Sequence, residues 1–271
     1  MQHVDSFVQR NEKKRRGERM KAIFVTHKGK IRQHNEDSGG VFFSQSGQRL
    51  AIVADGMGGH RAGDVASKMA LIKLQEEWEK AEKIETADQA ENWLKDHIDQ
   101  VNMVLYEHSK KHSECEGMGT TIVAAIITEL FSTIAHIGDS RCYIYNETGF
   151  SQVTEDHSLV NELVRSGEIS KEDAENHPRK NVLLRALGTE TSVEMDIKTI
   201  LFEEGDRLLL CSDGLSNKVT ETEIVNILEN HLAIEEKANT LVKLANDYGG
   251  EDNISLIIVE YDPNSPKGDV K

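Results

Sequence analysis

The chain has 271 residues, of which 38% are hydrophobic and 29% are charged. This composition supports a sizeable core inside a charged exterior, and it excludes disordered and collagen-like chains. The formal net charge is -15, so most of the surface would repel nucleic acid and anionic membranes. The sequence has no apolar run of about 20 residues and no signal peptide. We therefore expect one large cytoplasmic domain, with neither nucleic acid nor a membrane as partner.

The amino-terminal segment differs in charge from the rest of the chain. Residues 1–21 carry seven Lys or Arg and three acids, without a helical or strand period. We expect residues 1–20 to form a flexible basic leader outside the fold, residues 21–261 to form a single domain, and residues 262–271 to form a short tail.

Three short runs rich in branched and aromatic residues open the domain and predict strands. They are Ala22–Thr26, Val41–Phe43 and Leu50–Ala54. From Ala62 the apolar residues Val65, Met69, Ile72 and Trp78 recur at helical spacing, which predicts a long helix with these residues on its buried face. A second helix is expected from about Thr86, because Thr86 and Gln89 have the spacing of a capping box.

Strand composition then returns in six segments. These are Thr120–Ile127, Thr133–Ile137, Arg141–Tyr145, Met195–Phe202, Arg207–Cys211 and Ile254–Tyr261. Two helices are expected before the last strand, one opening at Thr220 and one around Glu235–Asn246. Runs of strands with paired helices predict an α+β fold of antiparallel sheets covered by helices, rather than a doubly wound parallel sheet.

The segment Asp156–Gly188 departs from this pattern. It is charged and contains two short helical pieces, Leu159–Arg165 and Lys171–Glu175, between predicted strands. We expect a flap of about residues 156–188, the kind of segment that often carries function.

Aspartates lie at one end of four apolar strands, at Asp55, Asp139, Asp213 and Asp252. A lone Asp-Gly pair is usually a turn, but the pairs at Asp55 and Asp213 both lead into helical sequence. If the four strand ends converge, mutual repulsion would raise the pKa of the carboxyls unless cations neutralise them. Ligands that are all oxygen favour magnesium or manganese. Spacing alone leaves the convergence open.

Arg32 precedes Glu36 and Asp37 by four and five residues. One interpretation is a solvated turn with a local ion pair, which is the commoner origin of such a cluster. The other is a phosphate clamp, since a guanidinium can bind a phosphoryl group through two parallel hydrogen bonds.

Six ordered motifs resemble the bacterial form of the metal-dependent type 2C protein serine/threonine phosphatases (PPM), from about Lys21 to Glu260. The motifs are Gly29–Asp37, Val53–Gly59, Gly117–Thr121, His136–Arg141, Leu210–Leu215 and Gly250–Asn253. The resemblance implies a four-layer αββα sandwich with two central antiparallel sheets flanked by helix pairs, and metals between loops at one end of the sheets.

The resemblance also implies a role for each matched residue. Arg32 would bind the phosphate, and Asp139 would share a third, weaker ion with Asp213. The other ligands would be Asp55, which bridges two core ions, the Gly56 carbonyl, Asp213, Asp252, Glu36 and, through water, Asp37. One position departs from the family: Met57 stands where many eukaryotic members have a histidine proposed as general acid. His60 is as easily a surface residue, so the general acid stays unassigned.

The activity implied is hydrolysis of phosphoserine and phosphothreonine in proteins, by attack of a hydroxide that bridges two Mn²⁺ or Mg²⁺ ions. The expected partners are phosphoproteins and an opposing bacterial Ser/Thr kinase, and the expected state is a monomer. Arg179, Lys180 and Arg185 in the flap would attract a phosphopeptide. Two alternatives stay open: another two-metal phosphoester hydrolase, and a catalytically silent phosphoprotein-binding module.

Overall fold

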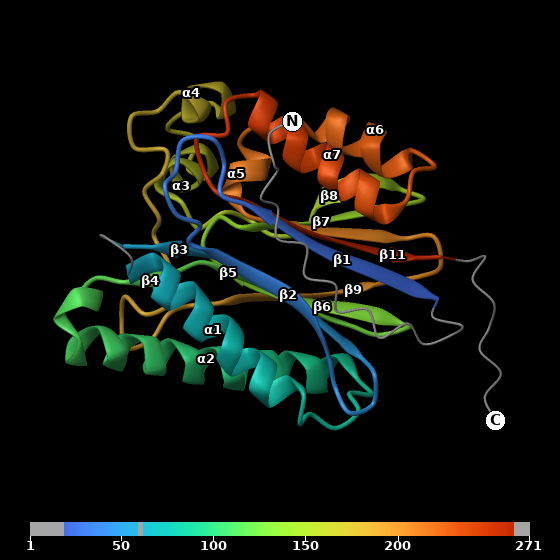
Figure 1. The fold of residues 1–271 in the computed structure, drawn as a ribbon, viewed down its shortest axis with the longest axis horizontal. Helices are drawn as coiled ribbons and strands as arrows, with labels where there is room; N and C mark the ends of the chain where they lie inside the picture. The colour runs from blue at the N-terminus through green and yellow to red at the C-terminus, as the bar shows by residue number, and fades with distance from the viewer. Residues whose placement is uncertain (1–18, 59–61, 263–271) are drawn as a thin grey trace.

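A computed structural model describes residues 19–58 and 62–262, and it contains two antiparallel β-sheets packed face to face (Figure 1). The first sheet has the order β1-β11-β10-β7-β8. Its strands are β1 (Met20–His27), β11 (Ile254–Tyr261), β10 (Arg207–Cys211), β7 (Arg141–Asn146) and β8 (Gly149–Gln152). The second sheet has the order β2-β3-β5-β6-β9, and β4 pairs with β3. Its strands are β2 (Asp37–Phe43), β3 (Arg49–Met57), β4 (Gly119–Thr120), β5 (Ile122–Ile127), β6 (Phe131–Ile137) and β9 (Asp196–Leu201).

Helices cover the outer face of each sheet, as Figure 1 shows. The long helices α1 (Ala62–Trp78) and α2 (Ala87–Lys111) lie on the second sheet, and α6 (Glu221–Glu229) and α7 (Ile234–Asp247) lie on the first. The flap contains α3 (Leu159–Arg165) and α4 (Lys171–Glu175), while α5 (Asp213–Ser216) follows β10 directly. A short 3₁₀ turn spans Ser113–Cys115. The predicted four-layer αββα sandwich is confirmed.

Three apolar layers hold the four structural layers together. Between the sheets, Val53 and Val123 of one sheet belong to the same buried cluster as Leu210 and Ile257 of the other. Each outer face has its own cluster against its helix pair. Strands buried on both faces are apolar without alternation, which explains the continuous runs seen in β3 and β5.

The two long helices lie where they were predicted, but the buried face of α1 differs from the predicted one. Thr86 caps α2, and the capping box with Gln89 is present. On α1, however, the expected face is wrong at Ile72, whose side chain is 50% exposed. The buried face of α1 instead consists mainly of small residues such as Ala66 and Ala70. Small side chains let a helix lie close to a sheet, so the buried stripe is displaced from the one that the largest apolar residues indicated.

The strand ends differ from the expected boundaries at several places, two of which bear on the site and on the ends of the domain. β1 begins at Met20, and the Asp262 N–H donates to the Arg19 carbonyl, so residues 19, 20 and 262 extend the ladder between β1 and β11. The rest of the expected leader and tail, residues 1–18 and 263–271, lies outside the described part of the chain. β3 continues through Asp55 to Met57, because β4 pairs with it there.

Among the described helices, none is long and apolar enough to cross a membrane.

Candidate active site

The carboxylates singled out in the sequence meet at one edge of the sandwich. Within the second sheet, the register pairs Asp37 with Asp55 across β2 and β3. Asp139 follows β6 at the same edge, since the start of β5 pairs with the end of β6. In the first sheet, Asp213 follows the end of β10 and Asp252 precedes the start of β11, which are antiparallel neighbours. The convergence that spacing alone left open is therefore observed, and it draws on both sheets.

Both backbone polar groups of Asp55 are hydrogen-bonded to Thr121. Its N–H donates to Thr121 Oγ1 over 3.0 Å, and its carbonyl accepts from Thr121 N at 2.9 Å. The adjacent Gly56 lies so close to α1 that a Cβ atom would be 2.1 Å from the Gly63 carbonyl oxygen. Only glycine permits this approach of helix to strand.

Asp37 and Asp213 each have one oxygen in a hydrogen bond. The Ser212 hydroxyl donates to Asp37 Oδ2 over 2.8 Å, and Asn217 Nδ2 donates to Asp213 Oδ2 over 3.0 Å. Within residues 19–58 and 62–262, the other oxygen of each carboxylate, Asp37 Oδ1 and Asp213 Oδ1, is buried without a hydrogen-bond partner. Buried acceptors without partners are uncommon and require an explanation such as a bound ion.

The loop between β1 and β2 carries Arg32 and Glu36, and Asn253 fastens it. Asn253 Nδ2 donates to the carbonyls of Lys28 and His34 at 2.9 Å, and its Oδ1 accepts from Glu36 N at 2.8 Å. Arg32 Nη2 donates to Asp252 Oδ2 over 2.7 Å, so its ion pair is with the opposite loop rather than with Glu36 or Asp37 of its own loop.

Crowding of the carboxylates raises their pKa values. Burial, opposed by hydroxyl hydrogen bonds and reinforced by Asp213 and Asp252, raises the pKa of Asp37 to about 7. Burial and neighbouring carboxylates also raise the pKa of Asp139 to about 7 and that of Asp213 to about 6. Burial and four neighbouring aspartates raise the pKa of Asp55 well above its usual range. The cluster is therefore unfavourable for several negative charges unless cations share it.

The donor set fits hard divalent cations. It offers carboxylate oxygens, the unpartnered Asp37 Oδ1 and Asp213 Oδ1, and no thiol, because the described cysteines are buried elsewhere in the sheets and the loop after α2. Oxygen ligands with high negative charge density suit Mg²⁺ and Mn²⁺.

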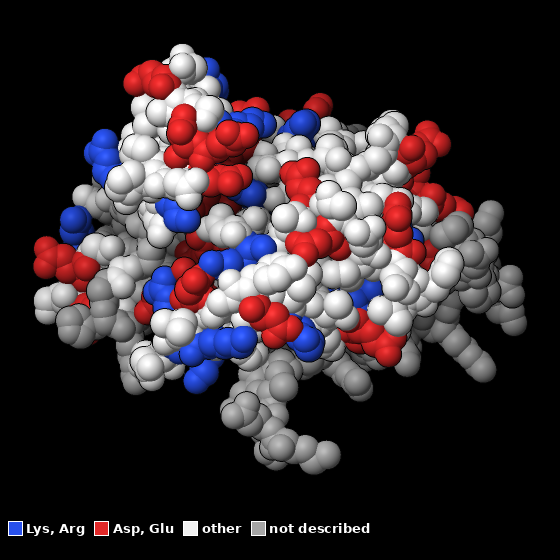
Figure 2. All heavy atoms as spheres, turned by 90° about the horizontal axis from the view of Figure 1, so that it is seen from above, with Lys and Arg blue, Asp and Glu red and all other residues white. Residues whose placement is uncertain are grey.

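The expected basic residues of the flap differ in their contacts. Arg185 is paired with Glu194 and Asp196 at 2.7 and 3.1 Å, so its charge is largely neutralised beside β9. Lys180 Nζ donates to the Glu175 carbonyl within the flap. On the face seen in Figure 2, acidic and basic side chains are interspersed. His60 lies outside the described residues.

Sequence reasoning missed the residues that orient the carboxylates. Four residues are hydrogen-bonded to the site or its loops, although the sequence predicted roles only for their neighbours: Thr121, Ser212, Asn217 and Asn253. Their one signal was position, since each lies within or within four residues of a quoted motif.

Comparison with known proteins decides the family. The model of the family described as protein phosphatase 2C matches residues 27–247, which include all of these carboxylates except Asp252. The chain belongs to the protein phosphatase 2C family. The resemblance stated from the six motifs is thus confirmed, and the chain is a metal-dependent phosphoprotein phosphatase.

Named relatives agree with this placement. The chain is 53% identical over 243 residues to the serine/threonine phosphatase Stp of Listeria monocytogenes, covering 90% of this chain and 96% of that protein. The crystal structure of the serine/threonine phosphatase Stp1 from Staphylococcus aureus matches with 39% identity and a TM-score of 0.84, covering 92% and 98% of the two chains. The catalytic domain of the phosphatase PstP in complex with two manganese ions matches with 31% identity and a TM-score of 0.77, covering 89% and 97%. These matches favour a protein serine/threonine phosphatase over both alternatives.

Proposed function

We propose that this protein phosphatase 2C member hydrolyses phosphoserine and phosphothreonine in proteins by direct attack of an activated water, without a phosphoenzyme. The observation that carries the proposal is the meeting of carboxylates from both sheets beside Arg32. The two core ions would be held by Asp55, the Gly56 carbonyl, Glu36, Asp213 and Asp252, with Asp37 acting through water. When bound, such ions lower the pKa of a water molecule and neutralise phosphoryl oxygens.

Arg32 is suited to orient the phosphoryl group. Its side chain is 51% exposed at the rim of the carboxylate cluster, and only Nη2 is used in the contact with Asp252. The remaining N–H groups of the guanidinium can donate to phosphoryl oxygens in the paired geometry that arginine favours.

A cysteine nucleophile is not supported by the structure. Cys115, Cys142 and Cys211 are all buried, and burial raises the pKa of each thiol. A thiol with a raised pKa contributes little thiolate at neutral pH.

The activity is tested by metal removal. We expect turnover of a phosphothreonine peptide to vanish in EDTA and to return when excess Mn²⁺ or Mg²⁺ is added, because none of the residues that the structure describes at the site can replace the cations. A phosphotyrosine peptide serves as the specificity control. Undiminished turnover in the chelator would refute the two-ion mechanism.

We also propose that the phosphatase is a monomer and that it opposes a Ser/Thr kinase.

We further propose a third, weaker ion between Asp139 and Asp213. Fewer charged ligands give weaker binding of hard cations. Asp139→Ala is therefore expected to keep two tightly bound Mn²⁺ ions and to lose most turnover of phosphopeptides, as measured by calorimetry and steady-state kinetics. In the alternative, Asp139 pairs with Arg141; the ion pair of Arg141 is instead with Asp156, and its charge only partly offsets the rise in the pKa of Asp139. Unchanged turnover and Mn²⁺ stoichiometry in Asp139→Ala would contradict the assignment.

A further inference from the structure

The turn between β6 and β7 carries Asp139 and has a constrained shape. Gly138 has φ +106°, and a Cβ atom there would lie 2.6 Å from Thr121 Cγ2. Thr121 Oγ1 is also 2.8 Å from Ser140 Oγ. The turn is therefore packed on its inner side against the residue that supports Asp55.

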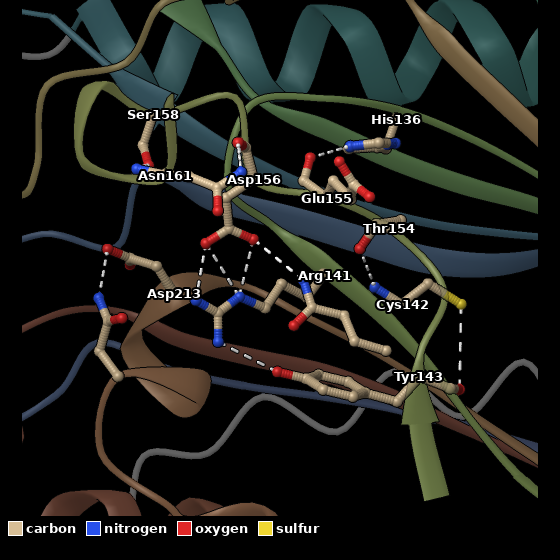
Figure 3. A network of polar contacts seen from close by, with 12 residues as sticks. His136, Arg141, Cys142, Tyr143, Thr154, Glu155, Asp156, Ser158, Asn161 and Asp213 are labelled. Atoms are coloured by element: carbon tan, nitrogen blue, oxygen red, sulfur yellow. Dashed lines mark hydrogen bonds and ion pairs between the residues drawn. The ribbon is translucent and has the colours of Figure 1, made fainter. Parts of the chain in front are cut away.

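Asp156, the first flap residue, holds the far end of this turn through Arg141. Arg141 Nε lies 2.9 Å from Asp156 Oδ1, and Arg141 Nη2 lies 2.6 Å from Asp156 Oδ2 (Figure 3). Arg141 Nη1 also donates to the Tyr143 hydroxyl over 3.2 Å. With one edge of the guanidinium bound in parallel to both carboxylate oxygens, the direction of the Arg141 side chain is fixed.

His157, the second flap residue, holds the near end. Its N–H donates to the Gly138 carbonyl over 2.8 Å, and its Nδ1 accepts from Gly138 N at 3.2 Å. Burial and the neighbouring His136 and Arg185 lower the pKa of His157 to about 4, so the ring is neutral and Nδ1 keeps its lone pair at neutral pH. On the other side of the ring, Nε2 lies 3.2 Å from Arg185 Nη1 and 3.5 Å from Asp196 Oδ2.

The same two residues are bound by the rest of the flap. Asn161 Nδ2 in α3 donates to the Asp156 carbonyl over 2.9 Å (Figure 3). Leu184 N, near the end of the flap, donates to the His157 carbonyl over 2.8 Å. Both ends of the flap therefore connect to the turn that carries Asp139.

His136, His157 and Asp196 lie close enough together to suggest a metal site, but their hydrogen bonds argue against one. His157 Nδ1 is occupied by the Gly138 N–H, and its Nε2 lies 3.2 Å from the Arg185 guanidinium. A cation there would meet another cation and no available nitrogen on His157. The cluster functions better as a hydrogen-bonded support.

We propose that Asp156 and His157 are positioning residues that grip the Gly138–Arg141 turn from both ends and so couple the flap to the position of Asp139. This inference rests on the proposed function, in which Asp139 holds the third ion. Displacement of the flap would then loosen the turn and weaken that ion, while the ligands Asp55, Asp213 and Asp252 keep their own supports.

The experiment compares variants of the full chain by amide hydrogen exchange and by calorimetric titration with Mn²⁺. Asp156→Asn weakens the grip on Arg141. His157→Gln places an amide near Nε2 and removes the acceptor for Gly138 N, whereas His157→Asn keeps an acceptor near Nδ1. Glu260→Gln is the matched control, since it breaks a partly buried pair with Lys237, 2.6 Å in length, at the far end of β11.

In Asp156→Asn and His157→Gln we expect exchange at residues 138–140 to be about tenfold faster and the weakest Mn²⁺ site to be about tenfold weaker, the equivalent of one lost hydrogen bond. The two tight ions should be retained, and His157→Asn should stay close to the wild type. Unchanged exchange at the turn, an equal change in Glu260→Gln, or equal behaviour of His157→Asn and His157→Gln would overturn the proposal. If the wild type binds only two ions, the third-ion assignment fails, while the exchange rates still decide whether the grip exists.

Discussion

Arg32 contacts a residue that we assign to a metal ion, and this contact shapes how its substitution should behave. The guanidinium donates to Asp252 Oδ2 in the structure. In the absence of substrate, Arg32 therefore competes with a cation for that oxygen. Its removal should therefore leave the metal ligands at least as available as before.

We expect Arg32→Ala to lower kcat/KM for a phosphopeptide by about 10- to 100-fold, mainly through KM, because a hydrogen bond to a charged group contributes about 1.5–3 kcal/mol. Mn²⁺ affinity in calorimetry should not weaken. Asp55→Ala, in contrast, should lose Mn²⁺ binding and turnover together. Loss of Mn²⁺ binding by Arg32→Ala to the same degree as by Asp55→Ala would show that the two roles are not separate.

At this scale the sequence predicted the charged residues and missed their neutral supports. The aspartates stood out because each follows or precedes an apolar run, and the antiparallel register brings them together. Asn253 and Thr121 could not be assigned roles, since their partners, Lys28 to Glu36 for one and Asp55 for the other, are distant in sequence. The sequence does not indicate which distant backbone group a given amide or hydroxyl side chain will bind.

Among the elements, those with strong local signals were predicted and those that depend on neighbours were not. The capping boxes at Thr86 and Thr220 fixed the starts of α2 and α6. The short strands β4 and β8 lack an apolar run of their own and exist because β3 and β7 offer free edges to pair with. The extension of β3 beyond Ala54 has the same cause.

The cap of α2 should be separable from catalysis. We expect Thr86→Ala to cost about 1 kcal/mol of stability, because the hydroxyl satisfies an unpaired N–H at the helix start, and thus to lower Tm by about 2–4 °C. Gln48, in the turn between β2 and β3, contacts Ile84 near this cap, at the opposite end of those strands from Asp37 and Asp55. Calorimetry and kinetics on Thr86→Ala and Thr86→Ser test this. A loss of turnover without a loss of Tm would contradict it.

On the scale of the whole molecule, the site lies across the interface of the two sheets. Asp37, Asp55 and Asp139 come from the second sheet, and Asp213 and Asp252 come from the first. Repulsion among them opposes the packing of one sheet on the other. Cations that neutralise the cluster should therefore stabilise the entire sandwich.

This arrangement predicts an unusual pH dependence of the metal-free protein. The pKa values of Asp37 and Asp139, about 7, and of Asp213, about 6, lie above the ordinary value. Between the unfolded and folded pKa values the folded state holds more protons, so the free energy of unfolding falls as pH rises. In EDTA we expect Tm to fall from about pH 5 to about pH 7 and then to level off. Mn²⁺ should reduce this slope, and Asp37→Asn should reduce it in EDTA. A Tm that rises with pH in EDTA would disprove the prediction.

The position of β11 has a consequence for synthesis. β11 lies between β1 and β10, so the last described strand joins the first strand to the rest of its sheet. Just before it stand Asp252, which we propose as a metal ligand and which binds Arg32, and Asn253, which holds the loop of Arg32 in place. A nascent chain on the ribosome therefore has neither a closed first sheet nor a complete site until β11 has emerged from the exit tunnel. We expect translation that stops before this strand to yield no active phosphatase, so that activity appears only when nearly the whole domain has been made.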